Sequence, residues 1–333
     1  MVKNIKKNIK FNLLDNGIDY IYMGVKPMLK KSPKYKNSWK YSVLHLYSGI
    51  QLLLKERLKQ EDWTLIFKDL NKANREKFES KNFESAGFDD LIERLRKKIS
   101  NFNFNKEPIE NLQKLRNQTE HFEIDIPSIE CQMILALALD EIINFWQNYL
   151  ENNSEITIKQ KQKFQKIKSI ATEFDVYRKQ RLDKFQKEIN KIKRNKSGVR
   201  VLCPDCSSYS FIVFKNDVEE CQCLVCDIKY NKHDYIRKIR EVEGNELYDK
   251  ICSSCQQETI IKYEIKDEVS LYYCLNCLKS ELKDIPFEKK NYPYMQLTWE
   301  DILRKDKYTF DELYQFRLNK QRKTHLETYL GKE

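Results

Sequence analysis

Four Cys-x-x-Cys pairs in the second half of the chain constrain its fold more than any other feature of the sequence. The eight cysteines form two sets, in which the pairs are separated by sixteen and by eighteen residues: Cys203, Cys206, Cys223 and Cys226, then Cys252, Cys255, Cys274 and Cys277. A tight turn that carries two thiolates, joined by a hairpin to a second such turn, completes a tetrahedral ligand set for Zn²⁺. The spacing therefore predicts two structural zinc ions in two ribbons. Four thiolates leave no open position for a catalytic water.

The sequence also allows other ligand arrangements and roles for these cysteines. The pairs can alternate between two metals in a cross-braced arrangement, Cys221 can replace Cys223, and His233 can act as a further ligand. A redox function needs a thioredoxin-like βαβ setting, whereas short β-rich runs surround the pairs. Cys131 lies among apolar residues of a helical segment and is predicted to belong to the core.

The low content of glycine and proline, seven residues of each, disfavours a turn-rich all-β fold and predicts a mainly α chain. Apolar residues recur three and four positions apart in the first half, which predicts an up-and-down bundle of five helices. The expected helices span 11–28, 37–60, 88–99, 108–122 and 127–149. Prolines near the first turn open the last two of these helices, where the missing N–H costs nothing.

The chain divides into five predicted segments. They are a helical bundle at 1–152, a basic helical connector at 153–198, a first zinc ribbon at 199–240, a second zinc ribbon at 241–290 and a short helical C-terminal segment at 291–333. Tyrosines and phenylalanines with interleaved lysines surround the cysteine pairs. These aromatic residues either stack on bases, dock a protein or form the ribbons' own small cores.

The connector is strongly basic. Residues 156–196 contain fourteen Lys or Arg residues against four Asp or Glu residues, and the whole chain has a formal net charge of +11. One interpretation is a solvated helix that joins two domains. The other is a long basic helix that neutralises RNA phosphates and makes binding sensitive to salt.

The chain is predicted to be cytoplasmic, without a membrane segment. Its most apolar stretch, 133–146, is interrupted by Asp140 and Glu141, and no apolar region follows the basic N-terminus as a signal peptide requires. In a reducing compartment, cysteine pairs are metal ligands rather than disulfides.

A polar segment in the fourth predicted helix, KLRNQTEHF, contains Arg116, Asn117 and His121. At about 100° per residue, Asn117 and His121 share one helix face, whereas Arg116 lies roughly 140° around the helix from His121. Two copies of the helix across a two-fold axis would bring both groups to one phosphate. A purely structural alternative pairs Arg116 with Glu120 one turn on, leaves Asn117 on the surface and places His121 as a cap of the helix C-terminus.

Two separated segments together resemble one family. Residues 41–73, YSVLHLYSGIQLLLKERLKQEDWTLIFKDLNKA, resemble the second helix and following segment of bacterial HEPN (higher eukaryotes and prokaryotes nucleotide-binding) proteins. KLRNQTEHF falls on the fourth bundle helix, where that family carries an Arg-x4-6-His motif with Asn commonly in second position. The resemblance covers roughly residues 1–150 and implies a dimeric α-bundle ribonuclease in which Arg116, Asn117 and His121 form the catalytic set.

Two positions depart from the family pattern. Gln51 stands where many relatives carry an acidic residue in the second helix. Glu123 stands two residues after His121, where some relatives present a tyrosine that a partner enzyme adenylylates. Regulation by that modification is therefore not expected.

The chemistry needs no metal, because RNA carries its own nucleophile in the 2'-hydroxyl. An imidazole transfers protons near neutral pH, typically for about a 10²- to 10⁴-fold gain in rate, and a guanidinium holds phosphate oxygens. The prediction is a homodimeric endoribonuclease that leaves 2',3'-cyclic phosphate, acts in defence or as a toxin, and uses its ribbons to recognise substrate, a protein trigger or an inhibitor. The alternatives are a non-catalytic nucleic-acid-binding or sensor protein that dimerises through its bundle, and a protein–protein adaptor built on the ribbons.

Overall fold

The computed structural model describes residues 11–29, 38–195, 197–214, 220–243, 251–252, 254–257, 260–264, 270–277 and 280–283. The predicted C-terminal segment, 291–333, lies outside the described residues. Helices dominate the rest, which confirms the prediction of a mainly α chain. The chain divides into two compact units, one that ends at Arg181 and one that begins at Leu182. Among the described helices, none combines the length and apolar character that a membrane span requires.

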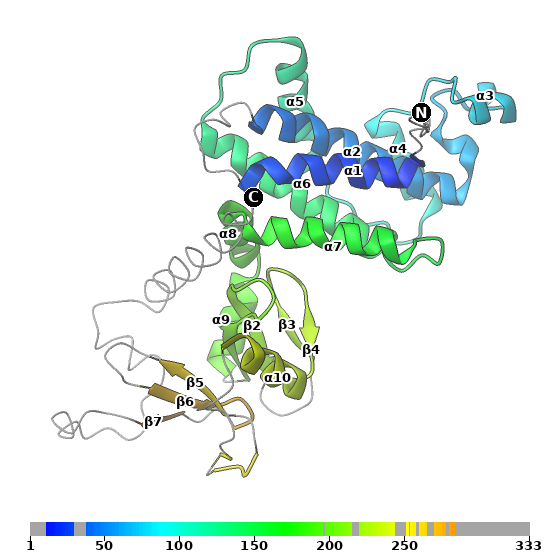
Figure 1. Ribbon diagram of the computed structural model, residues 1–333. Helices are drawn as coiled ribbons and strands as arrows, with labels where there is room; N and C mark the ends of the chain where they lie inside the picture. The colour runs from blue at the N-terminus through cyan, green and yellow to red at the C-terminus, as the bar shows by residue number, and fades with distance from the viewer. Residues whose placement is uncertain are drawn as a thin grey trace, which may run out of the picture. The chain divides into compact units, whose positions relative to one another are not determined.

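The first unit is built around a bundle of helices (Figure 1). Its long helices are α1 (Leu13–Val25), α2 (Ser38–Glu61), α4 (Phe88–Lys98), α5 (Glu107–His121), α6 (Ser128–Tyr149) and α7 (Ile158–Glu173). Helix α2 packs against α1, α4, α5 and α6 and is therefore central to the unit. The first five of these helices lie close to the bounds that apolar periodicity predicted.

Helices α1 and α2 approach each other closely because glycine lies at their contact. A Cβ atom at Gly49 would lie 2.5 Å from Cγ1 of Ile21, too close for any real side chain. Helix α1 begins at Leu13 and is capped by Asn12, whose side chain accepts a hydrogen bond from the backbone N–H of Asp15 at 2.7 Å. Apolar side chains that recur three and four residues apart fill the interface between the two helices.

Short elements follow α1 and occupy the connection between α2 and α4. They are the 3-10 helices η1 (Lys26–Leu29), η3 (Trp63–Ile66) and η4 (Leu70–Lys72), and the short helix α3 (Arg75–Ser80). The aromatic rings of Phe67 and Phe83 stack with their centroids 4.0 Å apart and give this part of the chain a small core.

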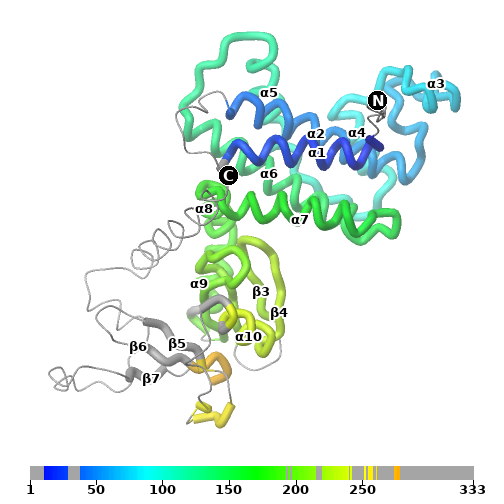
Figure 2. Tube along the Cα trace, viewed as in Figure 1, coloured from blue at the N-terminus to red at the C-terminus, as the bar shows by residue number. Residues whose placement is uncertain are grey.

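The predicted basic connector is not one long helix. It consists of α7, α8 (Asp175–Lys184) and α9 (Gln186–Asn195), and the division between the two compact units falls within α8. Figure 2 follows the chain through these three helices. Phe164 of α7 is fully buried and stacks on Trp146 of α6, with ring centroids 4.1 Å apart. Helix α7 is thus part of the bundle, because its apolar face is covered by the other helices.

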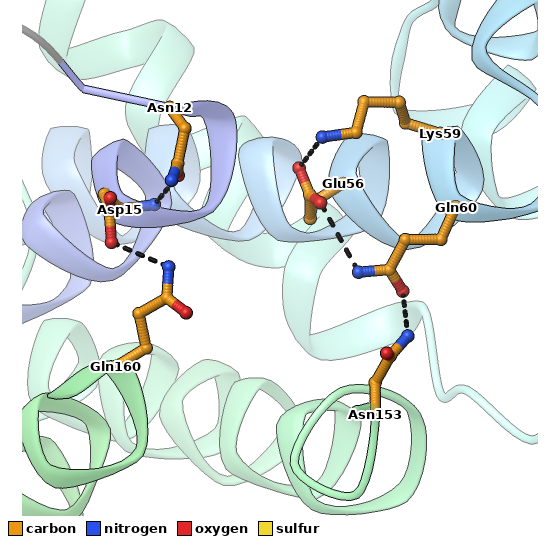
Figure 3. Close-up of polar contacts among 7 residues, drawn as sticks. All are labelled: Asn12, Asp15, Glu56, Lys59, Gln60, Asn153 and Gln160. Atoms are coloured by element: carbon orange, nitrogen blue, oxygen red, sulfur yellow. Dashed lines mark hydrogen bonds and ion pairs between the residues drawn. The ribbon is translucent and has the colours of Figure 1, made fainter. Parts of the chain in front are cut away.

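Polar contacts also tie the end of the bundle to α7 and to the loop before it (Figure 3). The side chain of Gln160 donates to Asp15 at 2.8 Å, and that of Asn153 donates to Gln60 at 2.8 Å. Gln60 in turn contacts Glu56, a carboxylate with only 5% exposure. Gln160 and Asp15, like Asn153 and Gln60, lie far apart in sequence, so these two contacts depend on tertiary packing.

The second unit contains two small antiparallel sheets. The first consists of β1 (Gly198–Leu202), β2 (Tyr209–Phe214), β3 (Cys221–Cys223) and β4 (Lys229–Tyr230) in that order, followed by α10 (Lys232–Glu243). The second consists of β5 (Ile260–Glu264), β6 (Ser270–Cys274) and β7 (Ser280–Lys283), also in chain order. Helix α9 packs Ile189 and Ile192 against Ile212 and Leu224 of the first sheet region.

Candidate functional site

The predicted Arg-Asn-x-x-x-His segment forms the exposed C-terminal end of α5. Pro108 lies at the first turn of this helix, and Leu112 and Leu115 are buried on its inner face. Thr119 continues that face and donates its hydroxyl to the carbonyl of Leu115 at 2.7 Å. The helix ends at His121, so the polar residues of the motif lie on the outer face of its last turns.

A single carboxylate oxygen connects the guanidinium and the imidazole of the motif. Nη2 of Arg116 lies 2.5 Å from Oε2 of Glu120, and Nε2 of His121 lies 3.6 Å from the same oxygen. Nη1 of Arg116 also donates to the side-chain oxygen of Asn117 at 3.0 Å. The side chains of Arg116, Glu120 and His121 are 32%, 39% and 59% exposed, so the cluster is open to solvent.

This geometry combines the two interpretations of the motif. The ion pair between Arg116 and Glu120, which the structural alternative predicts, is present. Arg116 and His121 point in different directions from the helix axis, yet the guanidinium and the imidazole both approach Oε2 of Glu120. The long side chain of Arg116 makes this possible. A second copy of the helix is therefore not needed to bring the two groups to one anion.

Side chains of helix α2 stabilise the position of Arg116. Cζ of Arg116 lies 5.7 Å from the ring centroid of Tyr47, which is only 5% exposed. Gln51 donates its side-chain N–H to the Tyr47 hydroxyl at 2.9 Å. Burial raises the pKa of Tyr47, even though the Gln51 hydrogen bond and the Arg116 charge lower it. The neutral ring of Tyr47 thus forms a cation–π contact with the guanidinium of Arg116, and Gln51 is hydrogen-bonded to the Tyr47 hydroxyl.

An exposed apolar surface follows the cluster along the chain. Phe122 and Ile124, in the loop after α5, are 78% and 42% exposed. Ile129, Met133 and Leu137 recur every four residues along α6 and are 58%, 47% and 42% exposed. The apolar stretch 133–146 belongs to one predicted helix, and the sequence did not identify this exposed surface. The buried positions between these three residues show that α6 has a second apolar face, which is exposed.

The basic residues of the predicted connector do not form one continuous helix face. Lys159 and Lys166 are exposed on α7 of the first unit, whereas Lys187 and Lys191 are exposed on α9 of the second unit. Lys163 pairs with Asp19 at 2.6 Å and contributes to packing of α7 on α1. Each unit therefore carries its own share of the positive charge.

The eight predicted cysteine ligands gather in two groups of four, each formed by two consecutive pairs. All four sulfurs of each group lie within 4.8 Å of one another. In the first group, the Sγ distances are 3.6 Å from Cys203 to Cys226 and 3.6 Å from Cys206 to Cys223. In the second group, the corresponding distances are 3.7 and 3.6 Å. The cross-braced alternative is not the observed arrangement.

These distances fit a metal rather than a disulfide. Four sulfurs placed tetrahedrally at about 2.3 Å from a metal lie about 3.8 Å apart, whereas a disulfide bond is about 2.05 Å long. Both groups of thiols could therefore hold a metal ion through four sulfur ligands. Cys221 and His233 lie outside the groups; Cys221 is buried on β3 and His233 is exposed on α10.

The same backbone turn builds three of the four knuckles. The N–H four residues after the first cysteine donates to that cysteine's carbonyl, at 3.0 Å for Ser207, 3.0 Å for Asp227 and 2.8 Å for Gln256. Each of these residues has a positive φ, of 53°, 60° and 56° respectively. The fourth knuckle lies partly outside the described residues. The turn orients both sulfurs of a pair toward one point. For this reason, the spacing of two residues between the cysteines predicts a metal site.

Hydrogen bonds favour the thiolate form at one cysteine of each group. Burial raises the pKa of Cys223, but hydrogen bonds from the other three thiols and from the backbone N–H of Cys226 lower it well below its usual value. Burial also raises the pKa of Cys255, while hydrogen bonds that include the backbone N–H of Gln257 lower it to about 7. Thiolates are the form that binds metal. Cys131, in contrast, is a buried core residue, and burial raises its pKa to about 11.

Aromatic residues of the first sheet serve its own packing. Phe211 and Tyr235 are fully buried and stack with ring centroids 4.5 Å apart, and the Tyr235 hydroxyl donates to the carbonyl of Leu202 at 2.9 Å. Tyr230 donates to the carboxylate of Asp205 at 2.8 Å. The side chains of the corresponding residues in the second sheet lie outside the described set. In the first sheet, the interpretation as a small core is the better one.

Comparison of the chain with protein-family models, with curated proteins and with solved structures finds no match. The sites described above are therefore interpreted from their own geometry and chemistry.

Proposed function

We propose that the chain is a metal-independent endoribonuclease of the HEPN type, with Arg116, Asn117 and His121 as its catalytic residues. The observation that carries the proposal is the approach of the Arg116 guanidinium and the His121 imidazole to one oxygen of Glu120, at 2.5 and 3.6 Å, on the exposed end of α5. A fixed cation and a proton-transfer group that reach one anion are the two components that RNA transesterification requires. The sequence resemblance supports the same assignment.

In the proposed reaction, the 2'-oxygen of RNA attacks the adjacent phosphorus, and His121 accepts the proton that the 2'-hydroxyl loses. Arg116 binds the non-bridging oxygens, on which negative charge accumulates, and Asn117 orients the guanidinium through the 3.0 Å hydrogen bond. The bond from phosphorus to the 5'-oxygen breaks, and that oxygen takes a proton from solvent or from an imidazolium. The products are a 2',3'-cyclic phosphate and a 5'-hydroxyl. The exposed lysines of α7, which belongs to the same unit as α5, would bind further phosphates of the RNA.

We also propose that two copies of the chain associate through the exposed apolar surface of α6. Support comes from Ile129, Met133 and Leu137, which leave a row of apolar side chains in water on the helix that follows the proposed site in the chain. Met133→Asp should shift a dimer to a monomer in sedimentation velocity. Met23→Asp is a matched control, because Met23 of α1 is 45% exposed and Met133 is 47% exposed. An unchanged sedimentation coefficient for Met133→Asp would contradict this interface.

The metal in each four-cysteine site is proposed to be Zn²⁺ with a structural role. The donor set of four thiolates and the sulfur spacing are those that zinc prefers, and no ligand position is left for water. The ribbons would then present a folded surface for RNA or for a protein that triggers or restrains the nuclease. A place in defence or toxin action in the cytoplasm is part of the same proposal and follows from the family resemblance alone.

A second candidate function is a non-catalytic nucleic-acid-binding or sensor protein. It is favoured by Gln51, which donates to the neutral Tyr47 hydroxyl where many members of the family carry an acidic side chain. The exposed ion pair between Arg116 and Glu120 is also sufficient to explain both side chains without catalysis. This candidate predicts RNA binding without cleavage, whereas an adaptor built on the ribbons predicts no salt-dependent affinity for RNA.

The test compares the wild-type chain with Arg116→Ala and His121→Ala on a fluorescently labelled single-stranded RNA in buffer with EDTA. Each substitution should reduce the cleavage rate by about 10²-fold or more. Arg75→Ala is a matched control, because Arg75 forms an exposed ion pair with Glu79 one turn on, at 2.7 Å. His233→Ala is the matched control for the histidine. Mass spectrometry should find cyclic phosphate ends.

Three outcomes separate the candidates. Cleavage that the two site variants lose and the two controls retain supports the nuclease. Salt-dependent binding without cleavage supports the sensor, and the absence of both supports the adaptor. Retained metal content after exposure to EDTA must be measured alongside, because loss of a structural metal would unfold the ribbons.

A further inference from the structure

Glu120, the ion-pair partner of Arg116 on the helix surface, carries a carboxylate that the proposed catalytic chemistry does not use. Its carboxylate is bound to Arg116 at 2.5 Å and approaches His121 at 3.6 Å through the same oxygen atom. A phosphodiester oxygen that is to be bound by Arg116 and reached by His121 must take the same place. One negative oxygen already occupies the position that the proposed function assigns to the substrate.

We infer that Glu120 is an internal competitor for the phosphate site, so that RNA binds only when its phosphodiester displaces this carboxylate from Arg116. The inference rests on the proposed function and deepens it, because it identifies how access to the site is limited. It also places the phosphate-binding position within one copy of the chain, at the atoms that now contact Oε2 of Glu120.

The surroundings of Arg116 favour displacement of Glu120 over movement of the guanidinium. The ring of Tyr47, itself buried, covers one face of the guanidinium at 5.7 Å, and Asn117 holds Nη1 at 3.0 Å. Glu120, by comparison, is 39% exposed and has solvent into which its side chain can rotate. Arg116 therefore stays in place while the carboxylate exchanges with another anion.

The magnitude of the competition is modest, because the pair is exposed. An ion pair one turn apart on a helix surface typically changes an equilibrium by about twofold, and a carboxylate about 4 Å from a bound phosphate in water weakens binding by roughly fivefold more. Neutralising Glu120 should therefore tighten binding by about five- to tenfold. This range is large enough to measure and small enough for substrate to overcome.

The experiment measures binding of a 2'-O-methyl RNA dodecamer, which has no free 2'-hydroxyl and is not cleaved, by fluorescence anisotropy across a salt series. Glu120→Gln, which keeps the shape of the side chain and removes its charge, should lower the Kd by about five- to tenfold. Because Arg116 contacts phosphate in both proteins, the gain in affinity should be present across the salt series and should shrink as salt screens the carboxylate. Circular dichroism checks that the variant keeps the helical fold.

Two controls make the test specific. Glu123→Gln removes the same charge two residues beyond His121, from a side chain outside the ion-pair cluster, and should change the Kd by less than about twofold. In an Arg116→Ala background, Glu120→Gln should have no effect, because the carboxylate then has no site to block. The inference is overturned if Glu120→Gln weakens binding or leaves it unchanged, if Glu123→Gln has the same effect, or if the tightening persists without Arg116.

This result is independent of the cleavage assay. If natural RNA is not cleaved but Glu120→Gln tightens binding through Arg116, the nuclease proposal fails and the internal competitor stands. If natural RNA is cleaved at Arg116 and His121 but Glu120→Gln has no effect on binding, the nuclease stands and the internal competitor fails.

Discussion

The two compact units of the chain reach a stable core by different means. In the bundle, long helices cover one another and fully bury large side chains such as Trp146 and Phe164. In the second unit, the cluster around the second cysteine group consists of Cys252, Ile260 and Cys274, so that two of its three buried residues are metal-ligand candidates. A bundle of this size can be stabilised by burial of apolar surface, whereas small sheets need an additional constraint. Loss of one contact should therefore have very different consequences in the two units.

Removal of a thiol ligand should produce the largest effect. Cys223→Ser should lower the bound metal by one ion per chain and unfold the first ribbon, because binding of a structural zinc contributes about 10 to 16 kcal/mol to small domains. The far-ultraviolet helical signal should remain close to that of the wild type. Metal analysis and limited proteolysis measure the two responses. Cys221→Ser, two residues away on the same strand, is the matched control and should retain the metal.

A core substitution in the bundle should have the next largest effect. Phe164→Ala removes the ring that stacks on Trp146 at 4.1 Å and should lower the free energy of unfolding of the first unit by about 3 to 5 kcal/mol. The metal content should stay the same. Ile158→Ala, on the same helix but 77% exposed, should cost less than about 0.5 kcal/mol in denaturant titration. Equal losses for the two variants would show that α7 is not part of the bundle core.

A smaller effect is expected at the knuckle turns. Ser207 has a φ of 53°, a conformation that glycine adopts without strain and a β-branched residue does not. Ser207→Gly should stabilise the first ribbon by about 0.5 to 1 kcal/mol, and Ser207→Val should destabilise it by a larger amount. Competition with a chromogenic chelator measures both. A gain with valine would contradict the turn described here.

The smallest effect is expected in the pH dependence of the stability of the bundle. Burial lowers the pKa of His45, although Asp19 partly raises it. The unfolded chain therefore binds a proton more readily than the folded one, and the contribution of His45 to stability is present above the usual histidine pKa and is lost as the pH falls through the folded value. Thermal unfolding of the first unit between about pH 7.5 and 5.5 should show this slope, and His45→Gln should reduce it. His233→Gln, in the second unit, should leave it as in the wild type.

Much of the bundle is predictable because its signals are local. Prolines at 108 and 127 mark the starts of α5 and α6, and apolar spacing defines the helices between them. The role of α7 is not predictable in this way. Its many lysines suggest a solvated connector, yet its apolar residues, Phe164 among them, are covered by helices far away in the sequence. The number of charged residues describes the exposed face of such a helix. It does not predict which segments cover the apolar face.

The candidate site was predictable in its residues but not in its geometry. Arg116, Asn117 and His121 were identified from one short segment, and Glu120 was expected to pair with Arg116. That Glu120 also approaches His121 and that Tyr47 lies under Arg116 depends on side-chain conformations and on packing between α2 and α5. The exposed row of Ile129, Met133 and Leu137 likewise becomes visible only when the other face of α6 is seen to be buried.

By itself, the sequence determined the helical class of the chain, the approximate ends of five helices and the grouping of eight cysteines into two sets. These properties follow from the spacing of neighbouring residues, since helix periodicity and the geometry of a Cys-x-x-Cys turn extend over only a few positions. Only the tertiary structure decided which unit each basic helix joins, which apolar face of α6 stays in water and which anion lies between Arg116 and His121. Those properties depend on the free energy of packing segments that are distant in the chain, and no local pattern encodes that balance.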